Sequence, residues 1–215
     1  SFPTRRSSDL KEIDFLGGTN FPVLDADKSE QMKTLAEKIA AEGDSVGGVL
    51  ESVILGMPAG VGEPWFGTLE SELSYALFSI PAIKGVQFGD GFDMVDSFGS
   101  EFNDSLQIIQ DNGKSKVITK TNHNGGINGG ISNGMPILFR CAVKPTPSIY
   151  KTQDTIDMSK NENAKLNIQG RHDPAIIHRA RIVVDSIASF VIYDALAGRF
   201  GTDFFGEKGN FWRKN

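Results

Sequence analysis

The residues best suited to chemistry lie together in one short segment, Gly170-Arg171-His172-Asp173-Pro174-Ala175. It places a guanidinium, an imidazole and a carboxylate directly before a long apolar stretch. Asp is a favoured N-cap, and proline suits the first helical position because its missing N–H would have no partner there anyway. The pattern therefore predicts a helix with Asp173 as its N-cap and Pro174 at its first position, which continues through Ala175 and the residues after it.

The start of this helix is a candidate anion site with an acid or base beside it. A helix N-terminus carries free N–H groups and a partial positive charge, and further donors come from Arg171, His172, His178 and Arg179. These groups together favour a phosphate. From the residues alone, a purely structural role is favoured over an anion site. In that alternative Asp173 only caps the helix, and Arg171 only pairs with a surface carboxylate.

Apolar residues recur at helical spacing through the rest of this stretch and are numerous enough to predict burial on more than one side. They are Ile176, Ile177, Ala180, Val183, Val184, Ile187, Phe190, Val191, Ala195 and Leu196. We therefore expect this helix in the interior of the protein.

Two further segments are candidate binding sites. The first is HNGGINGGISNG at 123–134, whose glycines let backbone N–H groups approach a phosphate or a ring system. It lacks the lysine of a Walker loop and the following helix of a dinucleotide fingerprint, so spacing alone favours a tight structural turn. The second is KPTPS at 144–148, where a lysine and two hydroxyls between prolines suit a phosphate tail. Its alternative is a strand end followed by a turn.

Other kinds of site are disfavoured. The three histidines and the single cysteine show none of the spacings that hold a metal ion, so we expect no metal site. Cys141 lies within the apolar run ILFRCAV, where a thiol behaves as a small hydrophobe, and one cysteine excludes a disulfide within the chain.

Composition excludes several classes of protein. The chain has 215 residues, of which 39% are hydrophobic and 23% charged, which is typical of a globular protein with a substantial core. Its net charge of -5 argues against nucleic acid as a partner. No apolar run approaches the length that spans a bilayer and none resembles a signal peptide, so we expect no membrane association and a cytoplasmic location.

Periodicity and turn residues predict an α+β protein. We expect helices at 28–41, beginning near Asp25 or Asp27 and ending before Gly43, and at 69–78; strands at 45–55, 84–88 and 136–143; and a short strand at 166–170. Residues 93–120 are polar and poorly periodic, which indicates an irregular excursion or a flap. No repeat or linker divides the chain, so one compact unit is favoured over two.

Three long blocks of the sequence resemble the chorismate synthase family, in the order in which that family has them. They are residues 61–93 (GVGEPWFGTLESELSYALFSIPAIKGVQFGDGF), residues 121–149 (TNHNGGINGGISNGMPILFRCAVKPTPSI) and GRHDPA with the helix that follows it. The resemblance runs from about Phe15 to Phe205. It departs at Asp185, where the family has a Glu, and this puts any contact that depends on Glu in doubt.

The beginning of the chain does not fit the family. The first ten residues, SFPTRRSSDL, are rich in Ser and Arg and resemble translated sequencing-adapter sequence. We interpret residues 1–10 as a non-native artefact and 11–215 as the C-terminal portion of a single domain. The resemblance implies that an N-terminal portion is missing, and with it both histidines that usually serve the family as acids.

The resemblance also implies a fold, an assembly and a set of site residues. The fold is a β-α-β sandwich, with helices packed between antiparallel sheets and incomplete in this chain, and the assembly is a homotetramer. Asp173 matches the aspartate that works with the flavin N5 in removing a substrate proton. The positions matched to FMN contacts are Pro81, Ala82, Gly129, Lys144, Pro145, Thr146, Pro147, Ser148 and Arg171.

The activity implied is a step of the shikimate pathway. It converts 5-enolpyruvylshikimate 3-phosphate to chorismate and phosphate by a 1,4-anti elimination that requires reduced FMN, with NADPH or another donor as the reductant. Most arginines that hold the phosphate lie in the missing portion, so we expect this chain alone to be inactive. Two alternatives stay open: a non-catalytic fragment that binds flavin or phosphate or mediates oligomerisation, and a purely structural oligomeric protein.

Overall fold

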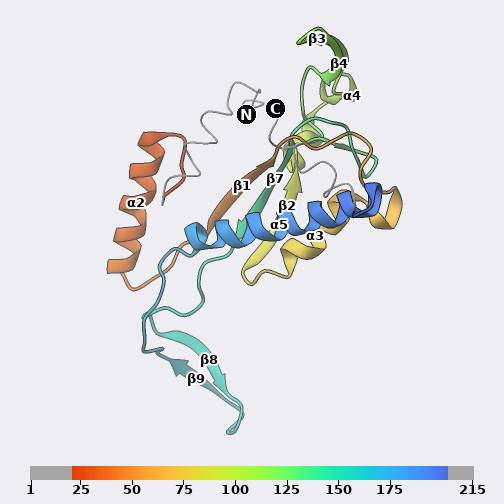
Figure 1. The fold of residues 1–215 in the computed structure, drawn as a ribbon. Helices are drawn as coiled ribbons and strands as arrows, with labels where there is room; N and C mark the ends of the chain where they lie inside the picture. The colour runs from red at the N-terminus through yellow and green to blue at the C-terminus, as the bar shows by residue number, and fades with distance from the viewer. Residues whose placement is uncertain (1–20, 203–215) are drawn as a thin grey trace. The chain divides into compact units, whose positions relative to one another are not determined.

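The computed structural model describes residues 21–202 (Figure 1). The proposed artefact at 1–10 lies outside them. The chain divides into two compact units: the first contains Glu51–Cys141 and the part from Val183 onward, and the second contains Ala142–Ile182 and the part up to Leu50. The boundaries fall inside two strands and one helix, where no linker composition marks them. This is why the sequence indicated a single unit.

The strand order of the central sheet is β1-β7-β2, formed by β1 (Gly48–Ile54), β7 (Ile137–Val143) and β2 (Ile83–Phe88). The bounds of all three strands agree with the predicted ranges, 45–55, 84–88 and 136–143, to within three residues at either end. β7 is the middle strand, and every second residue of it is buried, from Ile137 to Val143. This alternation is the period that one covered sheet face imposes.

In the first unit, α3 (Leu69–Phe78) matches its predicted bounds. The Thr68 hydroxyl accepts a hydrogen bond from Ser71 N at 3.0 Å, which caps the helix. Leu69, Leu73 and Leu77 are buried at helical spacing. Local signals alone therefore define this helix.

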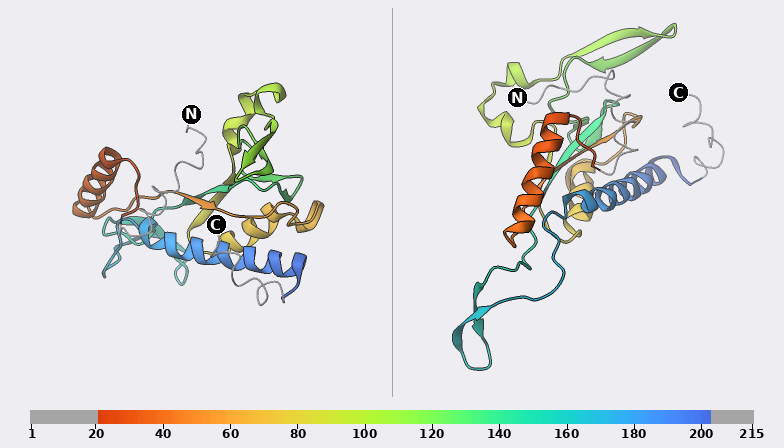
Figure 2. Two further views of the ribbon diagram at one scale, coloured as in Figure 1. Left: turned by 45° about the horizontal axis from the view of Figure 1, so that its top comes forward. Right: turned by 90° about the vertical axis from the view of Figure 1, so that its left-hand side faces the viewer.

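The long helix α5 (Ile177–Phe200) buries one face rather than several. Val184, Ala188 and Val191 are buried, whereas Ile182 is 62% exposed and Phe190 is 70% exposed. Figure 2 shows that, within the first unit, the part of α5 from Val183 onward runs along the same side of the sheet as α3. The prediction of burial on more than one side is wrong, because the outer face of α5 has no layer of the described chain over it.

The polar stretch expected to be irregular forms regular elements. Short helical turns η3 (Gly91–Asp96) and α4 (Gly99–Phe102) lead into an antiparallel hairpin of β3 (Leu106–Asp111) and β4 (Lys114–Thr119). The first alternative for 93–120, an irregular excursion, is therefore wrong, and the second, a flap, stays a prediction. The prediction relied on the lack of hydrophobic periodicity, but this hairpin is specified by its turn and not by a buried face.

The second unit contains α2 (Ala26–Ala41) and a second hairpin. Asp25 caps α2 by accepting a hydrogen bond from Lys28 N at 3.0 Å, as predicted, but the helix has no buried residue. Strands β8 (Gln153–Asp157) and β9 (Glu162–Leu166) pair antiparallel. The strand expected at 166–170 is wrong except for its first residue, because β9 pairs upstream of that range.

Within residues 21–202, none of the helices is long and apolar enough to cross a membrane. No group of three or more His, Cys, Asp or Glu side chains in that range is placed to hold a metal ion.

Candidate functional site

In the second unit, a short segment before β1 hydrogen-bonds to both of the segments predicted to carry chemistry. The Ser45 hydroxyl donates to Thr146 O at 2.6 Å, and Val46 N donates to Pro174 O at 2.8 Å. We call residues 45–48, which lead into β1, the strand entry. The KPTPS segment (144–148) and the Asp173-Pro174 segment thus hydrogen-bond to adjacent residues of this strand entry. The structure brings these two predicted parts of the site together.

Two glycines at this strand entry permit the close approach. A Cβ at Gly47 would lie 2.3 Å from Val143 O, and a Cβ at Gly48 would lie 2.3 Å from Ile177 Cδ1. The backbone carbonyl of Val143 cannot move away from a Cβ at position 47, so this position needs glycine, whereas the end of the Ile177 side chain could shift away from a Cβ at position 48. The pair Gly47-Gly48 is the sequence signal that could have identified this segment.

Asp173 does not cap α5. The helix begins at Ile177, and the Asp173 side chain instead closes a local turn, with Oδ1 accepting from Ala175 N at 3.2 Å. The predictions that Asp173 is the N-cap and Pro174 the first helical residue are therefore wrong. The reason is tertiary: Pro174 O is bonded to Val46 N, which holds this step outside the helix.

The Asp173 carboxylate is held on both sides. Arg179 Nη2 lies 3.2 Å from Oδ2, while Arg171, which the plainer alternative paired with a carboxylate, is exposed. Oδ2 is buried and accepts no hydrogen bond within the described part of the chain. The Oδ2 atom therefore keeps an acceptor lone pair that no hydrogen bond of residues 21–202 uses.

Tyr150 ties the segment after KPTPS to the segment that contains Asp173. Tyr150 N donates to Gly43 O at 2.9 Å, its hydroxyl donates to Gly170 O, and its ring meets the His172 ring edge-on at 4.4 Å between centroids. The sequence analysis did not identify Tyr150. No local pattern relates it to residues 20 positions further along the chain.

An ion pair also links the residue before the strand entry to the residue after Tyr150. Lys151 Nζ lies 2.7 Å from Asp44 Oδ2. Hydrogen bonds from Lys151 and from Ser45 N lower the pKa of Asp44, and the bond to Asp44 raises the pKa of Lys151. Both groups therefore stay charged near neutral pH, beside the strand entry.

The KPTPS segment fits an anionic or flavin ligand. The Thr146 hydroxyl is buried and has no hydrogen-bond partner within residues 21–202, while Lys144 is exposed. A buried hydroxyl without a partner is costly, and a ligand that bonds to it would remove that cost. This donor set of an ammonium and a hydroxyl suits a phosphate tail.

In the first unit, the glycine-rich segment contains a small hairpin. β5 (Ile127–Asn128) and β6 (Ile131–Ser132) pair antiparallel across Gly129 and Gly130, whose φ angles are 60° and 90°. The tight turn favoured from spacing is therefore present. Gly129 is exposed, and a Cβ there would meet nothing within 4 Å, so the tip of the hairpin is open to a ligand.

Pro81 and Ala82 form a turn between α3 and β2. Ile83 N donates to Ile80 O at 3.3 Å, which closes the turn, and Ala82 has a φ of 76°. Positive φ is rare for a residue with a Cβ and is found more often than average at functional sites.

The residues predicted to contact FMN, together with Asp173, divide between the two units. Pro81, Ala82 and Gly129 belong to the first unit, and Lys144 to Ser148, Arg171 and Asp173 belong to the second. That they surround one ligand stays a prediction.

Two other residues singled out from the sequence have defined places. Cys141 is fully buried in β7, and burial raises the pKa of its thiol to about 11, which confirms that it acts as a small hydrophobe. Asp185, which stands where the family has Glu, accepts a hydrogen bond from the Ser52 hydroxyl at 3.2 Å. The Asp185 carboxylate therefore reaches β1.

The fold and the site define an α+β protein with antiparallel sheets and a fixed carboxylate beside a segment suited to phosphate. A solved structure described as a crystal structure of chorismate synthase matches it with a TM-score of 0.73 and 29% identity, over 95% of this chain and 53% of that one.

The family model for chorismate synthase matches residues 7–197, and the chain belongs to the chorismate synthase family. The chorismate synthase of Methanobrevibacter smithii is 48% identical over 170 residues, which are 79% of this chain and 46% of that protein. That of Dehalococcoides mccartyi is 45% identical over 196 residues, or 91% and 52% respectively. The chain thus spans about half the length of the curated relatives it matches.

Proposed function

We propose that the complete protein converts 5-enolpyruvylshikimate 3-phosphate to chorismate and phosphate, in the shikimate pathway of the cytoplasm. Membership of the family supports this activity. One observation supports a role for particular residues of this chain in the activity. Pro174, next to Asp173, and Thr146 of the KPTPS segment both accept hydrogen bonds from the same strand entry. Besides reduced FMN, this elimination needs an acid–base group and groups that bind phosphate, and these two segments carry residues of both types.

In the proposed reaction a ring C–H bond and the C–O bond to phosphate break, a new C=C bond forms, and no net oxidation occurs. Asp173 receives the proton at its carboxylate, which Ala175 N and Arg179 hold in place. The positive charges of Lys144 and Arg171 favour the bound anions. The missing half of the relatives' length would supply the remaining cations.

The cofactor in this proposal is reduced FMN. Its contacts would be Pro81, Ala82, Gly129, Lys144, Pro145, Thr146, Pro147, Ser148 and Arg171. The chemistry that the flavin supplies when bound is a transient donation of electron density to the substrate. The buried Thr146 hydroxyl and the open position at Gly129 support the fit. NADPH is a candidate reductant for the flavin.

We further propose that residues 11–215 are the C-terminal portion of one domain whose complete fold is a β-α-β sandwich, and that the complete protein is a homotetramer. Residues 1–10 would not belong to the native chain. Since this chain has about half the relatives' length, it would turn over little or no substrate by itself. A chain that binds FMN without turnover would fit the alternative of a non-catalytic binding fragment until it is completed.

The test uses a completed protein, in which the segment that this chain lacks is supplied from the Methanobrevibacter smithii relative. Asp173→Asn keeps the size and shape of the side chain but removes its basicity. We expect kcat to fall at least about a hundredfold while the FMN Kd stays within about threefold of its original value. Chorismate formation is followed by absorbance under anaerobic conditions with reduced FMN.

The matched control is Asp154→Asn on β8, an exposed carboxylate in the second unit, and it should leave kcat unchanged. Equal kcat for the Asp173→Asn protein and the control would remove Asp173 from the mechanism. A completed protein that neither binds FMN nor forms chorismate would overturn the proposed function as a whole.

A further inference from the structure

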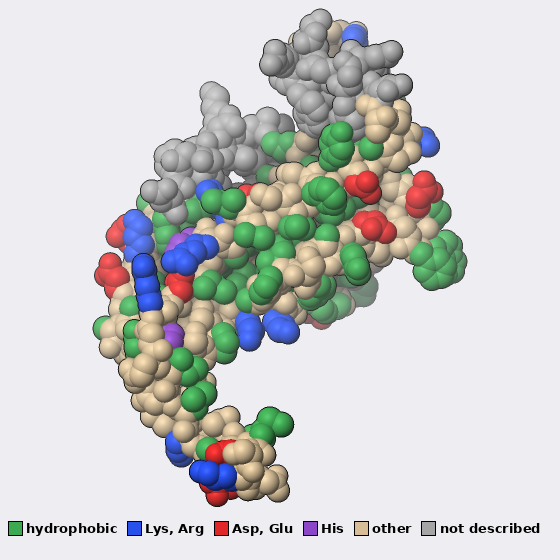
Figure 3. Space-filling view, turned by 60° about the horizontal axis from the view of Figure 1, so that its bottom comes forward, with side chains coloured by type: hydrophobic (Ala, Val, Ile, Leu, Met, Phe, Trp, Pro, Cys, Tyr) green, Lys and Arg blue, Asp and Glu red, His purple; other side chains and the backbone are tan. Residues whose placement is uncertain are grey.

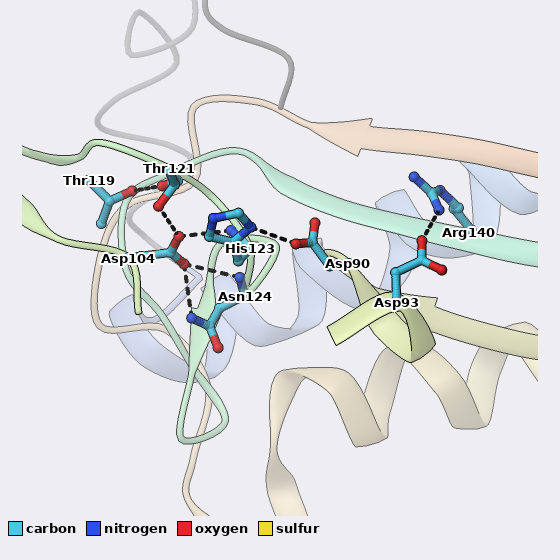
Figure 4. A network of polar contacts seen from close by, with 8 residues as sticks. All are labelled: Asp90, Asp93, Asp104, Thr119, Thr121, His123, Asn124 and Arg140. Carbon is cyan, nitrogen blue, oxygen red and sulfur yellow. Dashed lines mark hydrogen bonds and ion pairs between the residues drawn. The ribbon is translucent and has the colours of Figure 1, made fainter. Parts of the chain in front are cut away.

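Residues 121–125 lead into the glycine-rich hairpin, and we call them the hairpin entry. One carboxylate holds this hairpin entry in place (Figure 4). Asp104 Oδ1 accepts hydrogen bonds from the Thr121 hydroxyl at 2.7 Å and from His123 N at 2.8 Å. Its Oδ2 accepts from Asn124 N at 3.0 Å and from Asn124 Nδ2 at 2.9 Å. Four donors from three residues therefore converge on a single side chain about 20 positions away in the sequence.

His123 is held from a second direction. His123 Nδ1 lies 2.5 Å from Asp90 Oδ2, and Asp90 N donates to His123 O at 2.9 Å. The Phe102 ring lies 5.5 Å from the His123 ring, between centroids. Figure 4 shows His123 between Asp104 on one side and Asp90 on the other. The backbone and the ring of His123 are thus both immobilised.

Close backbone packing also holds this segment in place. A Cβ at Gly89 would lie 1.9 Å from His123 O, and a Cβ at Gly125 would lie 2.4 Å from Gly89 N. Leu138 O accepts from Gly89 N at 2.9 Å, and Leu138 N donates to Gly125 O at 3.2 Å. The hairpin entry is packed backbone to backbone, in contrast to the open tip at Gly129.

We propose that Asp104 is a positioning residue, which fixes the hairpin entry at 121–125 and thereby holds the tip at Gly129 in place to contact FMN. The identity of the ligand rests on the proposed function, whereas the positioning of the hairpin does not. A rigid entry with an open tip lowers the entropy lost when a ligand binds to the tip.

The arrangement requires a charged acceptor. Burial alone raises the pKa of Asp104, but the hydrogen bonds from Asn124, Thr121 and His123 outweigh it, and the net pKa is lowered. A carboxylate accepts at both oxygens. An asparagine at 104 would accept at one oxygen only, and its NH₂ group would face two donors.

The test compares Asp104→Asn with Asp96→Asn, the same isosteric change at an exposed carboxylate of η3. Two readouts are measured on the chain as it exists. The first is amide hydrogen exchange across 121–138, with the amides of α3 as an internal reference. The second is binding of oxidised FMN, followed by the quenching of its fluorescence and by the visible spectrum of the saturated complex.

For Asp104→Asn we expect the amides of Gly125, Asn133 and Leu138 to exchange at least about tenfold faster, with α3 unchanged, because two of four anchoring hydrogen bonds are lost. We expect the FMN Kd to rise about tenfold or more, and the saturated complex to have an altered flavin spectrum. Asp96→Asn should change neither readout.

Unchanged exchange across 121–138 in Asp104→Asn would overturn the positioning role, whatever happens to FMN. Faster exchange with an unchanged Kd and an unchanged flavin spectrum would also overturn it, because Asp104 would then only support local structure. If the original chain binds no FMN, that result bears on the proposed function, and the exchange data still decide whether Asp104 fixes the hairpin entry.

Discussion

At the scale of single residues, Ala82 is in a backbone conformation that favours glycine. Its φ of 76° follows Pro81 in a turn closed by the bond from Ile83 N to Ile80 O. A turn with proline in its second position and positive φ in its third normally carries glycine in the third. Ala82 therefore stores backbone strain at a position that is itself matched to a flavin contact.

We expect Ala82→Gly to raise the free energy of unfolding by about 1 kcal/mol, because glycine adopts this φ without a Cβ clash. The measurement is urea denaturation followed by circular dichroism. Ala76→Gly in α3 is the control of opposite sign, since glycine inside a helix lowers stability by about 1 kcal/mol. If both substitutions destabilise the protein, Ala82 is not strained.

The sequence analysis proposed residues for the candidate site, and their roles stay predictions, but it did not predict the side chains that hold them in place. Lys144 to Ser148 and Asp173 were identified from residue types that suit phosphate binding and proton transfer, with the family resemblance. Arg179, Tyr150 and Asp104 hold parts of the candidate site in place, and no pattern predicted these roles. Tyr150 and Asp104 bond to segments about 20 residues away, and such contacts leave no local spacing in the sequence, because the fold alone creates the proximity.

At the scale of elements, the β3–β4 hairpin carries a turn signal that the expectation of an irregular stretch overlooked. Asn112 and Gly113 have φ angles of 50° and 76°, as a two-residue type I′ turn requires, and Asn-Gly is its favoured sequence. Leu106 and Ile108 remain 72% and 71% exposed. The turn and the ladder hold the hairpin without a buried face, so hydrophobic alternation gave little guidance.

We expect Gly113→Ala to loosen this hairpin locally by about 1 kcal/mol or more, because alanine disfavours positive φ. Amides of β3 and β4 should exchange faster, while the urea midpoint of the whole chain stays nearly constant because the hairpin buries little. Lys114→Ala, one position further and exposed, should leave the exchange unchanged. A large drop in the global midpoint would show that the hairpin is part of the cooperative core.

The helices show which local signals survive folding. α3 has the bounds predicted because its cap at Thr68 and its leucine spacing both lie within the helix itself. α5 begins at Ile177, later than the Asp173-Pro174 signal predicts, because Val46 N takes the Pro174 carbonyl. A local start signal fails where a tertiary hydrogen bond competes for the same backbone.

At the scale of the whole molecule, several large hydrophobic side chains of the first unit remain on the surface. Trp65, Phe66 and Tyr75 are 83%, 93% and 83% exposed, and Phe190 on α5 is 70% exposed. Figure 3 shows a view of the protein in which many hydrophobic side chains lie on the visible surface. Proteins seldom leave such a surface uncovered unless another chain segment or subunit contacts it. The chain spans about half the length of its relatives, so we expect further polypeptide to cover this face in the complete protein.

This expectation predicts that the chain alone binds the dye ANS and self-associates as its concentration rises. Phe190→Lys should weaken both effects, while the free energy of unfolding changes by no more than about 0.5 kcal/mol, because the side chain is mostly exposed. Dye fluorescence and sedimentation velocity are the measurements. Ile156→Lys on β8 adds the same charge at a residue 62% exposed and should leave self-association as it was. Equal effects of the two substitutions would attribute the change to net charge and not to the outer face of α5.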